Sequence, residues 1–124
     1  ARWRVVGYED RMGAVLAASD CVLSRAGATS LAEISALRLP ALLVPFPYAT
    51  ADHQTQNARA FVEAGAAFTI DDASVETPAF SKLLIELVSS QETRRSMSHA
   101  AAQFETRDAA AKLADVVIDA ASAR

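Results

Sequence analysis

Short apolar runs alternate along the chain with longer stretches of mixed polarity. Four runs have the length of a strand, and they occupy residues 4–8, 21–23, 41–44 and 67–70. A continuous apolar run of this length is typical of a strand in a parallel sheet that is covered on both faces. The sequence therefore predicts four short strands, with 21–23 and 41–44 buried on both faces.

Helical spacing fills the intervals between these runs. Leu31, Ile34 and Leu37 recur every three residues, and a similar apolar series runs from Phe80 to Val88. Such spacing places apolar side chains on one face of a helix. Asp10 and Asp52 are expected to cap helix starts, Pro78 suits a first helical turn, and Gly65 suits a helix end. The predicted helices are 12–18, 28–37, 53–64, 78–88, 92–104 and 108–121.

Alternation of strands and helices predicts the fold class. Parallel strands joined by helical crossovers form an α/β, Rossmann-like sheet flanked by helices, with Ala-rich helices at the C-terminal end. Ligands of such sheets bind outside the carboxyl ends of the strands. These ends are residues 8–10, 24–28 and 45–52, which are therefore the expected place of a site.

Composition narrows the function classes. The 124 residues are 52% hydrophobic and 22% charged, which fits one folded domain over 1–124. The net charge of −3 comes without a basic cluster, so no nucleic-acid partner is expected. No apolar run approaches the roughly 20 residues that span a bilayer. The single Cys21 excludes an intrachain disulfide, and its apolar surroundings favour a place in the core.

The first polar constellation follows the predicted strand 21–23. Gly27 permits close backbone approach, and the unpaired N–H groups of the helix start after it suit a phosphate. Thr29 and Ser30 add hydroxyl groups, and the carboxylate of Glu33 can accept hydrogen bonds from adjacent ribose hydroxyls. An alternative remains open, because Ser30 to Glu33 also matches a capping box that only closes a helix start.

The second constellation follows the predicted strand 41–44. Two prolines stiffen the loop, and His53, Gln54 and Asn57 then occupy the start of the next helix. Gln54 and Asn57 are three residues apart and share a face, and amide groups suit the vicinal hydroxyls of a sugar. The alternative is a solvated first turn capped by Asp52. No second histidine or carboxylate stands at metal-ligand spacing, so no metal or cofactor is expected.

Four ordered blocks together resemble one family. They are Arg25-Ala-Gly-Ala-Thr-Ser-Leu-Ala-Glu33, Leu39-Pro-Ala-Leu-Leu-Val-Pro45, His53-Gln-x-x-Asn-Ala58 and Ala64-Gly-Ala-Ala67. In this order and spacing they resemble the C-terminal domain of MurG-type UDP-N-acetylglucosamine transferases, which are glycosyltransferases of family 28 with the GT-B fold.

The resemblance implies a role for each matching residue. Glu33 would hold the ribose, and the pair His53-Gln54 with Asn57 would lie against the hydroxyls of N-acetylglucosamine (GlcNAc). The turn and helix start that face the phosphates and sugar would consist of Gly27, Ala28, Thr29 and Ser30. Arg25 would lie near the phosphates or have a structural role. The backbone of Tyr8 and Glu9 would meet the uracil, with Met12 nearby.

The resemblance also implies an activity. MurG-type enzymes transfer GlcNAc from UDP-GlcNAc to a lipid-linked muramyl-pentapeptide with inversion, in peptidoglycan synthesis at the inner face of the cell membrane. No catalytic residue is identified in this chain. We expect a fragment that lacks the N-terminal acceptor domain and the first part of the C-terminal domain.

Three alternatives stay open. The acceptor could be a different one, the chain could be a UDP-sugar-binding subunit completed by a partner chain, or the domain could bind no ligand. Helix faces left without the N-terminal domain, around residues 114–121, could also support self-association.

Overall fold

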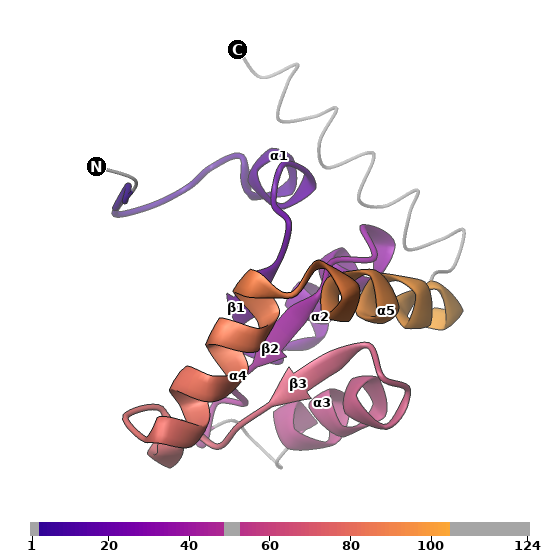
Figure 1. The fold of residues 1–124 in the computed structure, drawn as a ribbon. Helices are drawn as coiled ribbons and strands as arrows, with labels where there is room; N and C mark the ends of the chain where they lie inside the picture. Colours follow the sequence, from indigo (N-terminus) through magenta and orange to yellow (C-terminus); the bar gives the residue numbers. More distant parts are fainter. Residues whose placement is uncertain (1–2, 49–52, 105–124) are drawn as a thin grey trace.

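A three-stranded parallel sheet lies at the centre of the molecule (Figure 1). The computed structural model describes residues 3–48 and 53–104. The strands are β1 (Val22–Ser24), β2 (Ala41–Leu43) and β3 (Ala67–Thr69), in that order across the sheet. The register places Leu42 of β2 opposite Leu23 of β1 and Phe68 of β3. The predicted α/β, Rossmann-like fold class is confirmed.

Helices cover both faces of this sheet. Helices α2 (Ala28–Ala36) and α3 (His53–Glu63) pack on one face, and α4 (Pro78–Ser89) packs on the other. The first described helix is α1 (Met12–Ala17), and α5 (Gln91–Ala101) follows α4. Two short 3₁₀ turns complete the described part, η2 (Asp72–Ser74) and η3 (Ala102–Phe104).

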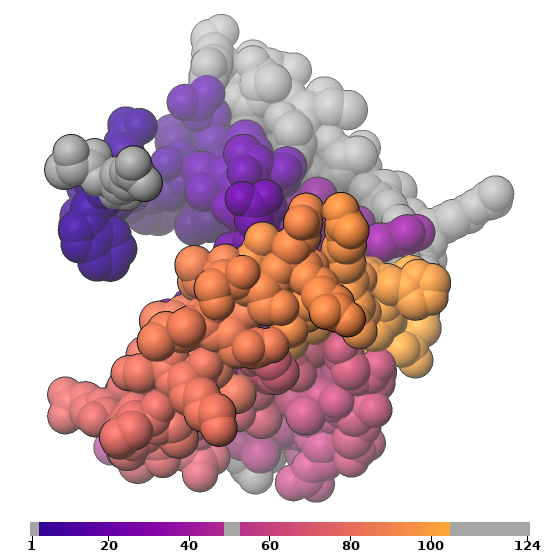
Figure 2. Space-filling view, viewed as in Figure 1, coloured from indigo at the N-terminus to yellow at the C-terminus, as the bar shows by residue number. Residues whose placement is uncertain are grey.

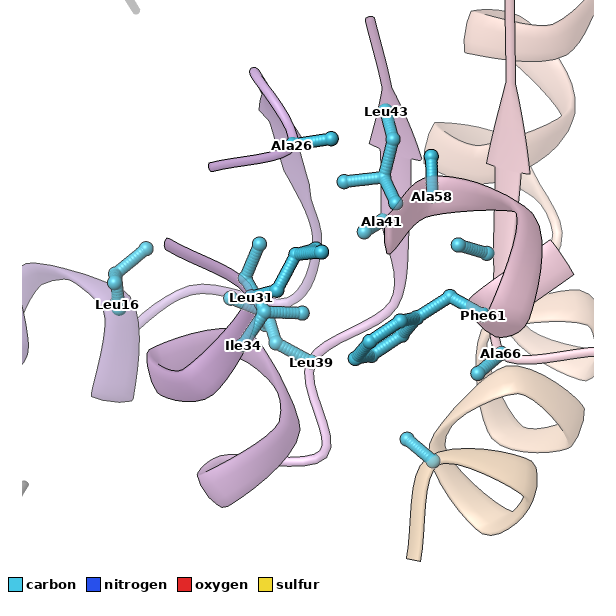
Figure 3. Packing of buried hydrophobic residues seen from close by; sticks show 12 residues of the cluster. Leu16, Ala26, Leu31, Ile34, Leu39, Ala41, Leu43, Ala58, Phe61 and Ala66 are labelled. Atoms are coloured by element: carbon cyan, nitrogen blue, oxygen red, sulfur yellow. The ribbon is translucent and has the colours of Figure 1, made fainter. Parts of the chain in front are cut away.

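The alternating side chains of the strands build two cores. On the first face Leu31, Ile34 and Phe61 pack against Ala41 and Leu43 (Figure 3). On the second face Leu42 packs against Leu87 of α4 and Met97 of α5. Because β2 is buried on both faces, the continuous apolar run of the sequence is explained there.

Several predicted boundaries are confirmed. Helix α3 ends before Gly65, whose φ of +81° suits a residue without a Cβ. Pro78 occupies the first turn of α4. Helices α1 to α4 lie within one residue of the predicted bounds, whereas α5 ends at Ala101, because residues 102–104 form a 3₁₀ turn. Asp52, the helix predicted for 108–121 and the self-association surface at 114–121 lie outside the described residues.

Three predictions are wrong. Residues 4–8 form no strand, and Val5 and Tyr8 are each 87% exposed, because no described strand lies beside them to pair with. Asp10 does not cap α1, whose N-cap is Arg11 without a side-chain hydrogen bond. Strand β1 is not buried on both faces, because it is an edge strand of this sheet and Leu23 is 48% exposed.

Within residues 3–48 and 53–104, we find no helix with the length and apolar character that crossing a membrane requires.

Candidate functional site

The carboxyl ends of the three strands meet at one edge of the sheet, as parallel pairing requires. Arg25 follows β1, Val44 follows β2, and Asp72 lies shortly after β3. This edge is where ligands of doubly wound sheets bind. The structure therefore brings the loop after β1 together with the start of α3, whereas no hydrogen bond joins Glu33 to Gln54 or Asn57 in the described chain.

The turn between β1 and α2 leaves a helix start open. Gly27 is the N-cap of α2 in an extended conformation (φ −66°, ψ 152°), and no side chain caps the helix. The backbone N–H of Leu31 bonds to the carbonyl of Gly27. The N–H groups of Ala28, Thr29 and Ser30 precede this first helical bond, so they are available to an acceptor from outside.

The capping-box interpretation of this stretch is wrong. Ser30 is the third residue of α2 rather than its N-cap, and Glu33 therefore lies in the middle of the helix. A capping box needs its serine or threonine at the N-cap position. The carboxylate of Glu33 thus has no capping role.

Glu33 lies outside the face with which α2 packs on the sheet. Leu31, Ile34 and Ser35 are the buried residues of α2, whereas Glu33 is half-buried. No hydrogen bond or ion pair of its side chain is found within the described chain. Of its neighbours at the helix start, Thr29 is exposed and Ser30 is half-buried.

Gln54 and Asn57 connect α3 to the loops that follow β1 and β2. The Oε1 atom of Gln54 accepts the backbone N–H of Phe46 at 2.8 Å and that of Ala26 at 3.3 Å. The Nδ2 atom of Asn57 donates to the carbonyl of Ala26 at 3.4 Å. Both peptide groups of the fully buried Ala26 are thereby held by α3.

The amide nitrogen of Gln54 lies beside the open helix start. A Cβ placed on Gly27 would be 3.7 Å from this Nε2 atom. Nε2 makes no hydrogen bond to residues 3–48 and 53–104, because Oε1 alone makes the contacts with Ala26 and Phe46. His53 precedes Gln54 at the start of α3 and is exposed.

Arg25 turns toward the end of β3. Its Nη1 atom lies 2.6 Å from Oδ1 of Asp72 and 3.4 Å from the carbonyl oxygen of Val44. Its guanidinium also lies 5.4 Å from the centroid of the Phe46 ring. Sequence reasoning missed Asp72, because a contact between residues 47 positions apart leaves no local pattern. Ala26 and Phe46 lie in the expected site ranges, but their contacts with Gln54 were not predicted.

The N-terminal segment is not part of this contact network. Tyr8 and Met12 are exposed, and the carboxylate of Glu9 accepts only the nearby backbone N–H of Arg11 in the described chain. The indigo segment projects from one side of the molecule and stands clear of α4 (Figures 1 and 2). The structure thus places these three residues apart from Gln54 and Asn57.

A groove of about 440 Å³ lies between α2 and α3, next to the open helix start. Ala28 and Asn57 stand at its end nearest the site, and Phe61 and Phe104 stack with ring centroids 4.4 Å apart at the other end. The walls of this groove are mainly apolar, so the polar site has an apolar surface beside it between α2 and α3.

Comparison with known proteins assigns this architecture to a family. The family model described as "Glycosyltransferase family 28 C-terminal domain" matches residues 2–113. This chain belongs to that family. The match to this family model confirms the resemblance that the four sequence blocks indicated.

Curated relatives of the domain carry one name. A UDP-N-acetylglucosamine–N-acetylmuramyl-(pentapeptide) pyrophosphoryl-undecaprenol N-acetylglucosamine transferase of Chlorobium phaeobacteroides is 42% identical over 118 residues, covering 95% of this chain and 32% of the relative. The transferase of the same name from Clavibacter michiganensis is 42% identical over 123 residues, covering 99% and 33%. The chain thus spans about a third of the length of these relatives.

A solved structure agrees with this assignment. The crystal structure of Acinetobacter baumannii MurG superposes with a TM-score of 0.75 at 27% identity, covering 94% of this chain and 33% of that one. The family 28 domain therefore shares the fold of a MurG segment as well as its sequence pattern.

Proposed function

We propose that this domain is the donor-binding part of a UDP-GlcNAc transferase of peptidoglycan synthesis. The observation that carries the proposal is the uncapped start of α2 after Gly27, with the amide nitrogen of Gln54 directly beside it. Free backbone N–H groups at a helix start suit a diphosphate, and an amide donor next to them suits a sugar hydroxyl. The names of the relatives support the same ligand.

The order of the helices supports one direction for the donor. Helix α2 packs against both α1 and α3. Helix α2 therefore lies between α1, which follows Tyr8, and α3, which carries His53 and Gln54. The uracil would lie near Tyr8, Glu9 and Met12, and the diphosphate at the helix start.

The sugar would then meet α3. In this arrangement GlcNAc contacts His53, Gln54 and Asn57, and its phosphates face the N–H groups of Ala28, Thr29 and Ser30. Glu33 would accept the ribose hydroxyls from its position on α2. Arg25 lies at the edge of this site, and its recorded contacts hold it toward Asp72.

The chemistry of this site is stabilisation of a leaving group. When the anomeric carbon of GlcNAc is attacked, UDP departs with additional negative charge on its β-phosphate. The N–H groups and the partial positive charge at the start of α2 would stabilise that charge. The general base for the acceptor hydroxyl and the lipid-linked acceptor itself would belong to another part of the enzyme, at the inner face of the membrane.

The test uses the ribose contact. The affinity of the chain for UDP and for a UDP analogue without the two ribose hydroxyls is measured by NMR titration for wild type, Glu33→Ala and Glu63→Ala. Loss of a charged acceptor for two hydroxyls should weaken UDP binding by about 10- to 100-fold. Glu63 is an exposed residue at the end of α3, so its variant is the matched control.

Two results separate the outcomes. Glu33→Ala should leave the affinity for the analogue at the wild-type value, because that ligand lacks the hydroxyls that Glu33 would hold. Equal losses for UDP and the analogue would contradict the ribose assignment, and a wild-type chain that binds neither would contradict the proposed function.

A further inference from the structure

One guanidinium connects the carboxyl ends of all three strands. Arg25 directly follows β1, its Nη1 atom contacts the carbonyl of Val44 after β2, and the same atom forms an ion pair with Asp72 after β3. The three strand ends carry the three loops that surround the candidate site. The position of one side chain is thus coupled to all three loops.

The contacts of Arg25 continue into the site through Phe46. The guanidinium lies on the ring of Phe46 at 5.4 Å from its centroid, and the backbone N–H of Phe46 donates to Oε1 of Gln54 at 2.8 Å. Gln54 also accepts from Ala26, the residue after Arg25. Asp72, Arg25, Phe46, Gln54 and Ala26 therefore form a connected series of contacts.

Strand alternation places Arg25 on the side of the sheet away from α2. Ala26 packs in the core beneath α2 and α3, so its neighbour Arg25 turns to the other face. There it borders a hollow of about 350 Å³ together with Leu23, Asp72 and Phe80 of α4. The guanidinium in this position is directed to the α4 side, whereas the uncapped start of α2 is on the opposite side.

We propose that Arg25 and Asp72 form a positioning pair for the donor sugar, an inference that rests on the proposed function. Asp72 holds the guanidinium over Phe46, and Phe46 fixes the Gln54 amide whose Nε2 atom faces the sugar. The ion pair is partly exposed, with side chains 48% and 36% accessible, so it adds little to folding stability. Its effect is on the geometry of the loop after β2.

The experiment measures dissociation constants of the chain for UDP-GlcNAc and for UDP by NMR titration. The variants are Arg25→Ala, Asp72→Ala and the double variant, with Asp71→Ala as the control. Asp71 is the adjacent exposed carboxylate, and its backbone carbonyl accepts the N–H of Ser74. Each single variant should weaken UDP-GlcNAc binding by about 3- to 10-fold and leave UDP binding unchanged.

The double variant tests whether the two residues act together. If Asp72 acts through Arg25, the double variant binds UDP-GlcNAc as Arg25→Ala does, and Asp71→Ala binds as wild type. Arg25→Lys should not restore affinity, because an ammonium group lacks the planar guanidinium that lies over Phe46 while its Nη1 atom contacts Asp72 and Val44.

Other results would overturn the pair. An equal loss of UDP binding in Arg25→Ala, rescued by Arg25→Lys, would mean that the guanidinium contacts the diphosphate directly. Additive losses in the double variant, or wild-type affinity in Asp72→Ala, would mean that Asp72 does not position Arg25. These results leave wild-type donor binding intact, whereas its absence would contradict the proposed function as well.

Discussion

The two polar atoms of the Gln54 side chain have different roles in this site. Its Oε1 atom holds the backbone of Ala26 and Phe46, while its Nε2 atom lies beside the start of α2. The sequence indicated a sugar-binding amide and gave no sign of the first task. The two tasks can be separated by substitution, because glutamate keeps the acceptor and lacks the donor.

The free energy of unfolding of Gln54→Glu should lie within about 1 kcal/mol of that of wild type, because a carboxylate oxygen still accepts both N–H groups. Its affinity for UDP-GlcNAc should fall more than its affinity for UDP, since charge repulsion acts on both ligands and the lost donor acts on the sugar. Gln54→Ala should cost about 1–3 kcal/mol in urea unfolding, because two N–H groups lose their acceptor. Equal losses for the two ligands in Gln54→Glu would argue against a sugar contact.

Gly27 has no conformational need for glycine in this structure. Its φ of −66° is open to any residue, and an added Cβ would only touch Gln54 at an ordinary distance. Gly27→Ala should therefore change the unfolding free energy by less than about 1 kcal/mol. It should weaken UDP binding at least about tenfold if the diphosphate approaches this backbone. A stable variant with wild-type affinity would place the phosphates elsewhere.

Cys21 is partly buried against the second core. Burial raises the pKa of its thiol above the ordinary value of 9.0. The positive charge of Arg94 lowers this pKa, and the negative charge of Asp20 raises it further. The folded state holds this proton more tightly than the unfolded state does. Stability from this group is therefore complete below pH 9 and declines as pH rises through the higher folded value. Alkylation by iodoacetamide should be slower in the folded chain than in urea, with its pH profile displaced upward. Coincident profiles would contradict the shift.

Elements with a strong apolar period could be predicted from the sequence. The buried faces of α2 and α4 follow from the spacing of Leu31, Ile34, Leu84 and Leu87, because each helix carries its own pattern. A strand cannot be predicted in the same way, because its backbone hydrogen bonds come from a neighbouring strand. The apolar run at 4–8 forms none, because its backbone groups need a neighbouring strand that the described chain does not provide.

Phe61 connects α3 to the rest of the first core. Its ring is 8% exposed and belongs to the first core together with Leu31 and Ile34 of α2 (Figure 3). It also stacks on Phe104, with ring centroids 4.4 Å apart. Phe61→Ala should lower the free energy of unfolding by about 3–5 kcal/mol in urea denaturation. Phe61→Leu is the control and should cost about 1.5 kcal/mol, because most of the volume remains. A similar loss of unfolding free energy in both variants would mean that the core closes the cavity that Phe61→Ala leaves.

At the scale of the whole molecule, the chain corresponds to about a third of the transferases that it resembles. We expect these 124 residues alone to transfer no GlcNAc from UDP-GlcNAc to a lipid-linked muramyl-pentapeptide acceptor, because none of the proposed contacts supplies a base or an acceptor site. Transfer is measured with radiolabelled donor, using a full-length relative as the positive control. Turnover by the chain alone would contradict the proposal that the base and the acceptor site belong to another part of the enzyme.

The α/β class, the helix faces, the central strand and the family follow from the sequence alone, because each depends on short-range periodicity or on ordered local blocks. The folded chain was needed to show that Ser30 does not cap α2, that β1 is an edge strand, and that Gln54 bonds to the loops after β1 and β2. The pairing of Arg25 with Asp72 belongs to the same group. The contacts of Gln54 with Ala26 and of Arg25 with Asp72 join residues 28 and 47 positions apart, and only the folded sheet brings their atoms within bonding distance.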